Sequence, residues 1–158
     1  MVLNVSTADF YTEDLLGKLE TAFAPIGMPL SLVTLDVSED VATGSSDKVV
    51  ARQIERLRRH GVRVALDDFG KGQASLTRLI DMPVDEIVIA QSFVERLWPG
   101  DPAMVVIQGL IQIARDLAIR VVAQGIETEV QASQLWTMGL RPRPGLCVLP
   151  AEQRRADG

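Results

Sequence analysis

The stretch Val62-Arg63-Val64-Ala65-Leu66-Asp67-Asp68-Phe69-Gly70-Lys71-Gly72 decides the fold of this chain. It begins as a short apolar run, which is typical of a buried strand, and it ends in two adjacent carboxylates and a loop with two glycines. Adjacent strand residues point to opposite faces, so Asp67 and Asp68 need not share a role. Two acids at the mouth of a buried strand are costly unless a cation or hydrogen-bond donors meet them. Two interpretations stay open here: a Mg²⁺ or Mn²⁺ site with oxygen ligands, or a strand end whose acids accept backbone N–H groups.

The bulk properties restrict the class of protein. A chain of 158 residues with 47% apolar and 23% charged residues is expected to form one globular domain. The net charge of −5 argues against a general nucleic-acid binder. Cys147 is the only cysteine, so no internal disulfide forms, and a cytoplasmic location fits. We expect neither a signal peptide nor a membrane span, because the N-terminus lacks a basic region and no apolar stretch reaches roughly 18 residues.

Strands and helices alternate on both sides of the central stretch. The predicted strands are residues 2–6, 30–37, 62–66, 85–90, 119–123 and 145–149. The predicted helices are residues 12–23, 47–60, 74–81, 102–117 and 129–139. This βα repetition predicts a parallel sheet with helices packed on it, and such folds place their sites at the carboxyl ends of the strands. The residues at those ends are Ser6, Asp36, Asp67, Asp68, Ala90 and Gln124.

Six segments, in order, resemble the EAL domain family, the bacterial cyclic-di-GMP phosphodiesterases. Asp67-Asp68-Phe69-Gly70-Lys71-Gly72 resembles the family's D-D-F-G-x-G and is the most specific match. The others are Asn4-Val5-Ser6 (N-x-S), Asp36-Val37-Ser38-Glu39 (E-x-T-E), Leu79 with Pro83-Val84-Asp85 (L-P-V-D), Ser92-Phe93-Val94 (from K-I-D-R-S-F-V), and Val121-Val122-Ala123-Gln124-Gly125-Ile126-Glu127-Thr128 (V-V-A-E-G-V-E-T). The resemblance covers residues 3–150 and implies an α/β, TIM-barrel-like (β/α) EAL fold, here incomplete with about six strands.

The resemblance also implies a chemistry, two-metal phosphodiester hydrolysis, against which this sequence can be compared. The strand with the Glu-Ala-Leu signature and its metal-binding Glu have no counterpart among these residues. The residual metal ligands are Asn4, Asp36, Asp67 and Asp68, and Asp36 stands where the family has the longer Glu. We expect no resident cofactor; an ion at any surviving site would be Mg²⁺ or Mn²⁺.

The later catalytic positions are substituted. Val88 replaces the family's Lys, Ala90 replaces the Asp two residues on, and Gln124 replaces a metal-binding Glu. Pro144 lies near the place of a terminal Gln, in a loose alignment. The catalytic set at the family positions Asp68, Val88 and Gln124 is therefore not intact. We predict that the chain is not an enzyme by itself.

The regulatory loop is better preserved than the catalytic positions. In the family, the segment after D-D-F-G couples the site to dimerisation, and the second Glu of E-x-T-E anchors that loop. Glu39 occupies the anchor position, and Gly70 and Gly72 retain the hinges. The alternative interpretation, that Glu39 only caps a loop of the inherited fold, has roughly equal weight.

These residues predict a degenerate EAL-like domain over residues 1–150, followed by a polar tail over 151–158. The predicted function is a catalytically inactive regulatory or protein-interaction module in bacterial signal transduction. The alternatives are a cyclic-di-GMP receptor without hydrolysis and an active phosphodiesterase completed by a partner. We expect a protein partner or a homodimer through the open edge at Val2–Val5, at most weak cyclic-di-GMP binding, and no nucleic-acid or membrane partner.

Overall fold

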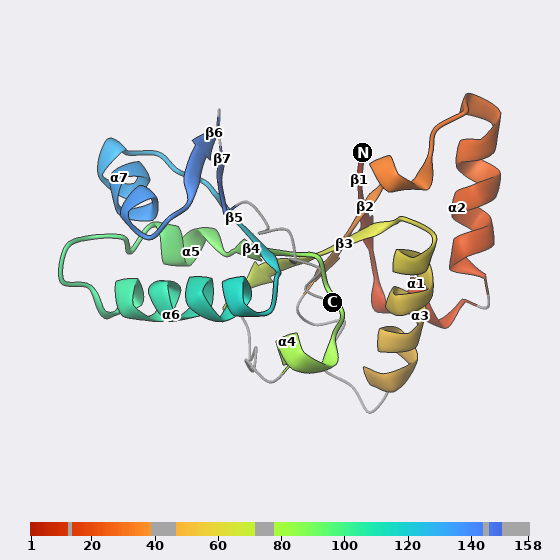
Figure 1. Ribbon diagram of the computed structural model, residues 1–158, viewed down its shortest axis with the longest axis horizontal. Coiled ribbons are helices and arrows are strands. Elements are labelled where there is room, and N and C mark those ends of the chain that lie inside the picture. Colours follow the sequence, from red (N-terminus) through yellow and green to blue (C-terminus); the bar gives the residue numbers. More distant parts are fainter. Residues whose placement is uncertain (13, 39–46, 72–77, 144–145, 150–158) are drawn as a thin grey trace, which may run out of the picture. The chain divides into compact units, whose positions relative to one another are not determined.

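The computed structural model describes residues 1–12, 14–38, 47–71, 78–143 and 146–149, and Figure 1 shows their arrangement into helices and strands. The strands are β1 (Val2–Val5), β2 (Thr34–Ser38), β3 (Arg63–Phe69), β4 (Glu86–Ile89), β5 (Arg120–Gln124), β6 (Arg141–Arg143) and β7 (Leu146–Leu149). The α-helices are α1 (Thr7–Tyr11), α2 (Leu15–Phe23), α3 (Asp47–Arg59), α4 (Arg78–Asp81), α5 (Gln91–Val94), α6 (Pro102–Asp116) and α7 (Glu129–Thr137). Two short 3₁₀ helices, η1 (Ala24–Ile26) and η2 (Leu30–Leu32), precede β2.

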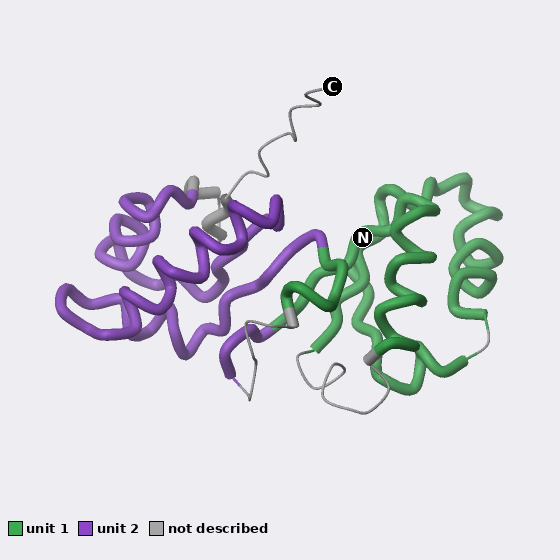
Figure 2. Tube along the Cα trace, turned by 60° about the horizontal axis from the view of Figure 1, so that its bottom comes forward, with its two compact units in different colours: residues 1–67, 72–84 green, residues 68–71, 85–158 purple. Residues whose placement is uncertain are grey.

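The chain divides into two compact units (Figure 2). Unit 1 comprises Met1–Asp67 and Gly72–Val84, and unit 2 comprises Asp68–Lys71 and Asp85–Gly158. The boundary passes between the two adjacent acids, so Asp67 and Asp68 belong to different units. The predicted polar tail over 151–158 lies outside the described residues.

Unit 1 contains three parallel strands in the order β1-β2-β3. Alternation along β2 gives its two faces different environments, because Leu35 and Val37 are fully buried, whereas Asp36 between them is half-buried. Helix α1 packs against α3. Buried apolar residues from the helices complete this core, namely Phe10, Leu15, Leu16, Leu19, Phe23, Val50, Ile54 and Leu57. One face of the sheet is therefore core, and the other is available for polar side chains.

Unit 2 pairs β4 with β5 in parallel, and α5 and α6 contact β5. The predicted starts of α6 and α7 are confirmed. Asp101 caps α6 by accepting a hydrogen bond from Ala103 N at 2.7 Å. Thr128 and Gln131 form a capping box for α7, with Gln131 N donating to Thr128 Oγ1 at 3.2 Å and Thr128 N donating to Gln131 Oε1 at 3.0 Å.

Three predicted elements differ from the structure. The last predicted strand is part of a β6–β7 hairpin, whose short connection joins two antiparallel strands, and β7 also pairs antiparallel with β5. The strand predicted from residue 30 begins at Thr34, since η2 follows Pro29. The helix predicted over 12–23 begins at Leu15, because Asp14 is its N-cap and accepts a hydrogen bond from Gly17 N at 3.0 Å. Seven strands are present among the described residues rather than six.

No helix in the described part of the chain is both long enough and apolar enough to cross a membrane.

Candidate functional site

The carboxyl ends of the three strands of unit 1 bring polar side chains to one face of the sheet. In the register, Asn4 lies opposite Asp36, and Ser38 lies opposite Asp67. Residues directly opposite each other in neighbouring strands point to the same side, and Asp36 and Ser38 share a face of β2 because they are two residues apart. The polar face is therefore the side away from Leu35 and Val37.

These side chains surround a hollow of about 400 Å³, which we call the acidic pocket. It is lined by Asn4, Val5, Ser6, Asp9, Asp36, Ser38 and Asp67. Three of the four predicted metal ligands thus lie together, whereas the fourth, Asp68, belongs to unit 2. The strand register is what makes positions 4, 36 and 67 neighbours.

Asp9 is a pocket residue that the sequence reasoning missed. Its carboxylate accepts hydrogen bonds from Ser6 N at 2.8 Å and from Ser6 Oγ at 2.7 Å. The bond from Ser6 N belongs to the capping box of α1. The bond from the Ser6 hydroxyl, followed by that from its N–H, lowers the pKa of Asp9. The Ser-x-x-Asp spacing at residues 6–9 was the signal that could have located it.

The donor atoms of the acidic pocket suit a hard divalent cation. Asn4 offers an amide oxygen, and Asp36 and Asp67 offer carboxylates, which are the oxygen ligands that Mg²⁺ and Mn²⁺ prefer. Asp9 is already engaged by Ser6. In the described part of the chain, no group of three or more His, Cys, Asp or Glu side chains is placed to hold a metal ion. The described donor set thus offers oxygen ligands for one divalent cation.

The end of β3 forms a turn that belongs to unit 2. Asp68 adopts a left-handed backbone conformation with φ of 53°, and Lys71 N donates to Asp68 O at 3.1 Å. Gly70 also has positive φ, at 95°, and a Cβ at this position would lie 2.5 Å from a ring atom of Phe93. Of the predicted regulatory loop, Gly70 is thus placed against α5, and Glu39 and Gly72 lie outside the described residues.

The residues predicted to replace catalytic groups occupy the strands and strand ends of unit 2. Val88 on β4 is only 4% exposed, and it lies opposite Val122 of β5, which is also buried. Ala90, immediately after β4, is buried, whereas Gln124 at the end of β5 is exposed. The position that carries Lys in the family is therefore an apolar, water-poor environment here.

An ion pair lies further toward the beginning of the same strands. Glu86 on β4 is opposite Arg120 on β5, and their side chains form a salt bridge. Both groups are partly buried, and the pair links β4 to β5 near the beginning of the two strands.

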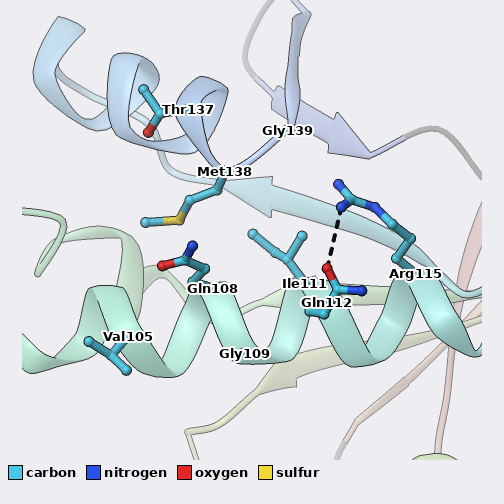
Figure 3. Close-up of a pocket in the computed structure, with 9 residues that line it drawn as sticks. All are labelled: Val105, Gln108, Gly109, Ile111, Gln112, Arg115, Thr137, Met138 and Gly139. Carbon is cyan, nitrogen blue, oxygen red and sulfur yellow. Dashed lines mark hydrogen bonds between the residues drawn. The ribbon is translucent and has the colours of Figure 1, made fainter.

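A second hollow, of about 530 Å³, lies in unit 2 along α6 and the end of α7 (Figure 3). It is lined by Val105, Gln108, Gly109, Ile111, Gln112, Arg115, Thr137, Met138 and Gly139. Figure 3 shows the side chain of Arg115 directed toward Gln112, and Arg115 Nη1 donates a hydrogen bond to Gln112 Oε1 at 3.5 Å. This groove contains none of the predicted site residues and no carboxylate among its lining residues, so it is not a candidate for the metal chemistry.

Comparison with known proteins identifies the family. The family described as EAL domain matches residues 2–150. The chain is 30% identical to the oxygen sensor protein DosP of Escherichia coli over 96% of this chain and 19% of that protein. It is 28% identical to the bifunctional diguanylate cyclase/cyclic di-GMP phosphodiesterase MucR of Pseudomonas aeruginosa, over 99% of this chain and 23% of that protein. The chain therefore spans only about a fifth of the length of these relatives.

Solved structures show the same fold. The MucR phosphodiesterase in complex with c-di-GMP has a TM-score of 0.77 at 28% identity, covering 87% of this chain and 56% of that one. The EAL domain of Mycobacterium smegmatis DcpA has a TM-score of 0.80 at 30% identity, covering 87% and 61%. A manganese/cy-diGMP complex of Klebsiella pneumoniae BlrP1 has a TM-score of 0.81 at 26% identity, covering 89% and 36%. The predicted fold, an incomplete TIM-barrel-like EAL fold, is thus confirmed, and the chain belongs to the EAL domain family.

Proposed function

We propose that this chain is a catalytically inactive, degenerate EAL domain that acts as a regulatory or protein-interaction module in bacterial signalling. The burial of Val88 carries the proposal. An apolar residue in a water-poor environment stands where the family uses a Lys, and its neighbour across the strands, Val122, is apolar as well. A cytoplasmic location is part of the same proposal.

The fall in reaction rate expected from the substituted positions supports the proposed inactivity. The loss of one charged or oriented catalytic group commonly lowers a rate by ~10²–10⁴. Val88, Ala90 and Gln124 remove a Lys and two carboxylates at positions that act together. Such losses are not additive, but two-metal hydrolysis that lacks several of these groups together is expected to lie near background.

The expected result is therefore no hydrolysis of cyclic-di-GMP by the purified chain in Mg²⁺ or Mn²⁺. The measurement is chromatographic detection of the linear product, with the EAL domain of MucR as positive control in the same buffer. Steady, metal-dependent product formation that scales with the concentration of this chain would overturn the proposal.

The acidic pocket favours a second candidate, a receptor that binds cyclic-di-GMP without cutting it. Asn4, Asp36 and Asp67 offer oxygen ligands for one divalent cation, which could bridge to a phosphate of the nucleotide. Isothermal calorimetry with cyclic-di-GMP, in Mg²⁺ and then in EDTA, separates the candidates. Metal-dependent micromolar binding would favour the receptor, or the enzyme completed by a partner; absence of heat in both buffers would favour the interaction module.

A protein partner is expected at strand β1. Within the described part of the chain, β1 pairs with β2 on one side and lies at the end of the strand order. Such an edge presents backbone N–H and C=O groups that can pair with another strand. We therefore expect a homodimer or a hetero-complex, and light scattering of the purified chain at micromolar concentration tests the first. A concentration-independent monomer mass would leave only a different protein as the partner; failure to recover any associated protein with the chain would then overturn the expectation.

A further inference from the structure

The turn at the end of β3 places an ammonium group on one member of the acid pair. Lys71 Nζ lies 3.1 Å from Asp68 Oδ2, within a salt bridge. The backbone bond from Lys71 N to Asp68 O spans the same two residues at 3.1 Å. The side-chain pair and the backbone bond therefore close one and the same turn.

The surrounding contacts hold this turn in place within unit 2. Ala90 N donates to Phe69 O at 3.4 Å, and the ring of Phe93 lies against Gly70. The positive φ angles of Asp68 and Gly70 give the turn its sharp bend. These contacts position the backbone of Lys71, whose ammonium reaches Asp68 within the same turn.

We propose that Lys71 is a built-in counter-ion of Asp68, which occupies this carboxylate in place of a divalent cation. The inference deepens the proposed inactive function and rests on it, because a chain that does not hydrolyse phosphodiesters has no need of a second metal ion.

The physical effect is mainly on cation binding and only slightly on stability. Lys71 is 67% exposed and Asp68 is 46% exposed, so solvent screens the pair and its contribution to folding is small. A fixed positive charge a few ångströms from a carboxylate nevertheless repels an incoming divalent ion and competes for the same oxygen atoms. Screened Coulomb interactions over such distances correspond to roughly threefold to tenfold in affinity.

The test is a titration of the whole chain with Mn²⁺. Calorimetry measures the heat of binding, and electron paramagnetic resonance measures the concentration of free Mn²⁺. Lys71→Gln is expected to bind Mn²⁺ about threefold to tenfold more tightly than the wild type. Lys71→Arg retains the charge and should keep the wild-type affinity. Lys48→Gln removes the same charge from the exposed start of α3 and serves as the matched control, which should also leave the affinity unchanged.

A further variant locates the effect. In the background of Lys71→Gln, Asp68→Asn should abolish the gain in Mn²⁺ affinity. Equal or weaker binding by Lys71→Gln, including no measurable binding in either protein, would overturn the inference, as would a gain that survives Asp68→Asn. None of these results depends on hydrolysis, so the inference and the proposed function can fail separately.

Discussion

Val88→Lys is expected to lower the free energy of unfolding by about 3–5 kcal/mol. Val88 is 4% exposed on β4, and its neighbour Val122 on β5 offers no polar partner. A buried ammonium without a counter-charge is among the most costly single substitutions. Denaturant unfolding followed by circular dichroism measures the change.

The destabilisation by Val88→Lys should also depend on pH. Burial lowers the pKa of an introduced lysine below its unfolded value, so the variant loses stability throughout the neutral range and regains part of it as the pH rises toward about 10. Restoring the family's Lys at this one position is therefore expected to damage the fold without restoring hydrolysis.

Val105→Lys is the matched control, because it makes the same chemical change on α6 at a side chain that is 73% exposed. It should alter the free energy of unfolding by no more than about 0.5 kcal/mol. If Val88→Lys were as stable as this control, the face of β4 would be open to water, and the argument for inactivity from the environment of Val88 would fail.

Gly70→Ala is expected to lower the free energy of unfolding by about 2–4 kcal/mol, from two separate causes. The φ angle of 95° is unfavourable for any residue with a Cβ, and that Cβ would lie 2.5 Å from a ring atom of Phe93. Thermal or denaturant unfolding measures the sum of the two effects.

The two causes can be separated within the same chain. Gly100 has a φ angle of 92°, and a Cβ there would meet nothing within 4 Å, so Gly100→Ala should show the backbone cost alone, about 1–2 kcal/mol. In a Phe93→Ala background, Gly70→Ala should cost a similar amount, since the ring has been removed. A full cost of Gly70→Ala in that background would mean that Phe93 does not hold the turn, and the positioning of Lys71 would need another explanation.

The family and most of the elements could be predicted from the sequence, because they depend on local signals. Alternating apolar runs and periodic helices identify strands and helices residue by residue, and the Thr128–Gln131 capping box and the Asp101-Pro102 start are complete within a few residues. The same local reading located Asp67 and Asp68 at a strand end. It also identified the substitutions at Val88, Ala90 and Gln124 by comparison with the family pattern.

The tertiary structure decided what these residues meet. Strand register brings Asn4, Asp36 and Asp67 into one pocket with Asp9, and register depends on which strands pair, which no local pattern specifies. The antiparallel β7 also required knowledge of its partner β5, because apolar runs look alike in both directions. The left-handed turn that puts Lys71 on Asp68 is held by contacts from Phe93 and Ala90, more than 15 positions along the chain. The sequence by itself thus determined the family and led to the prediction of substituted catalytic positions, whereas long-range packing decided where the charges lie and which partners they have.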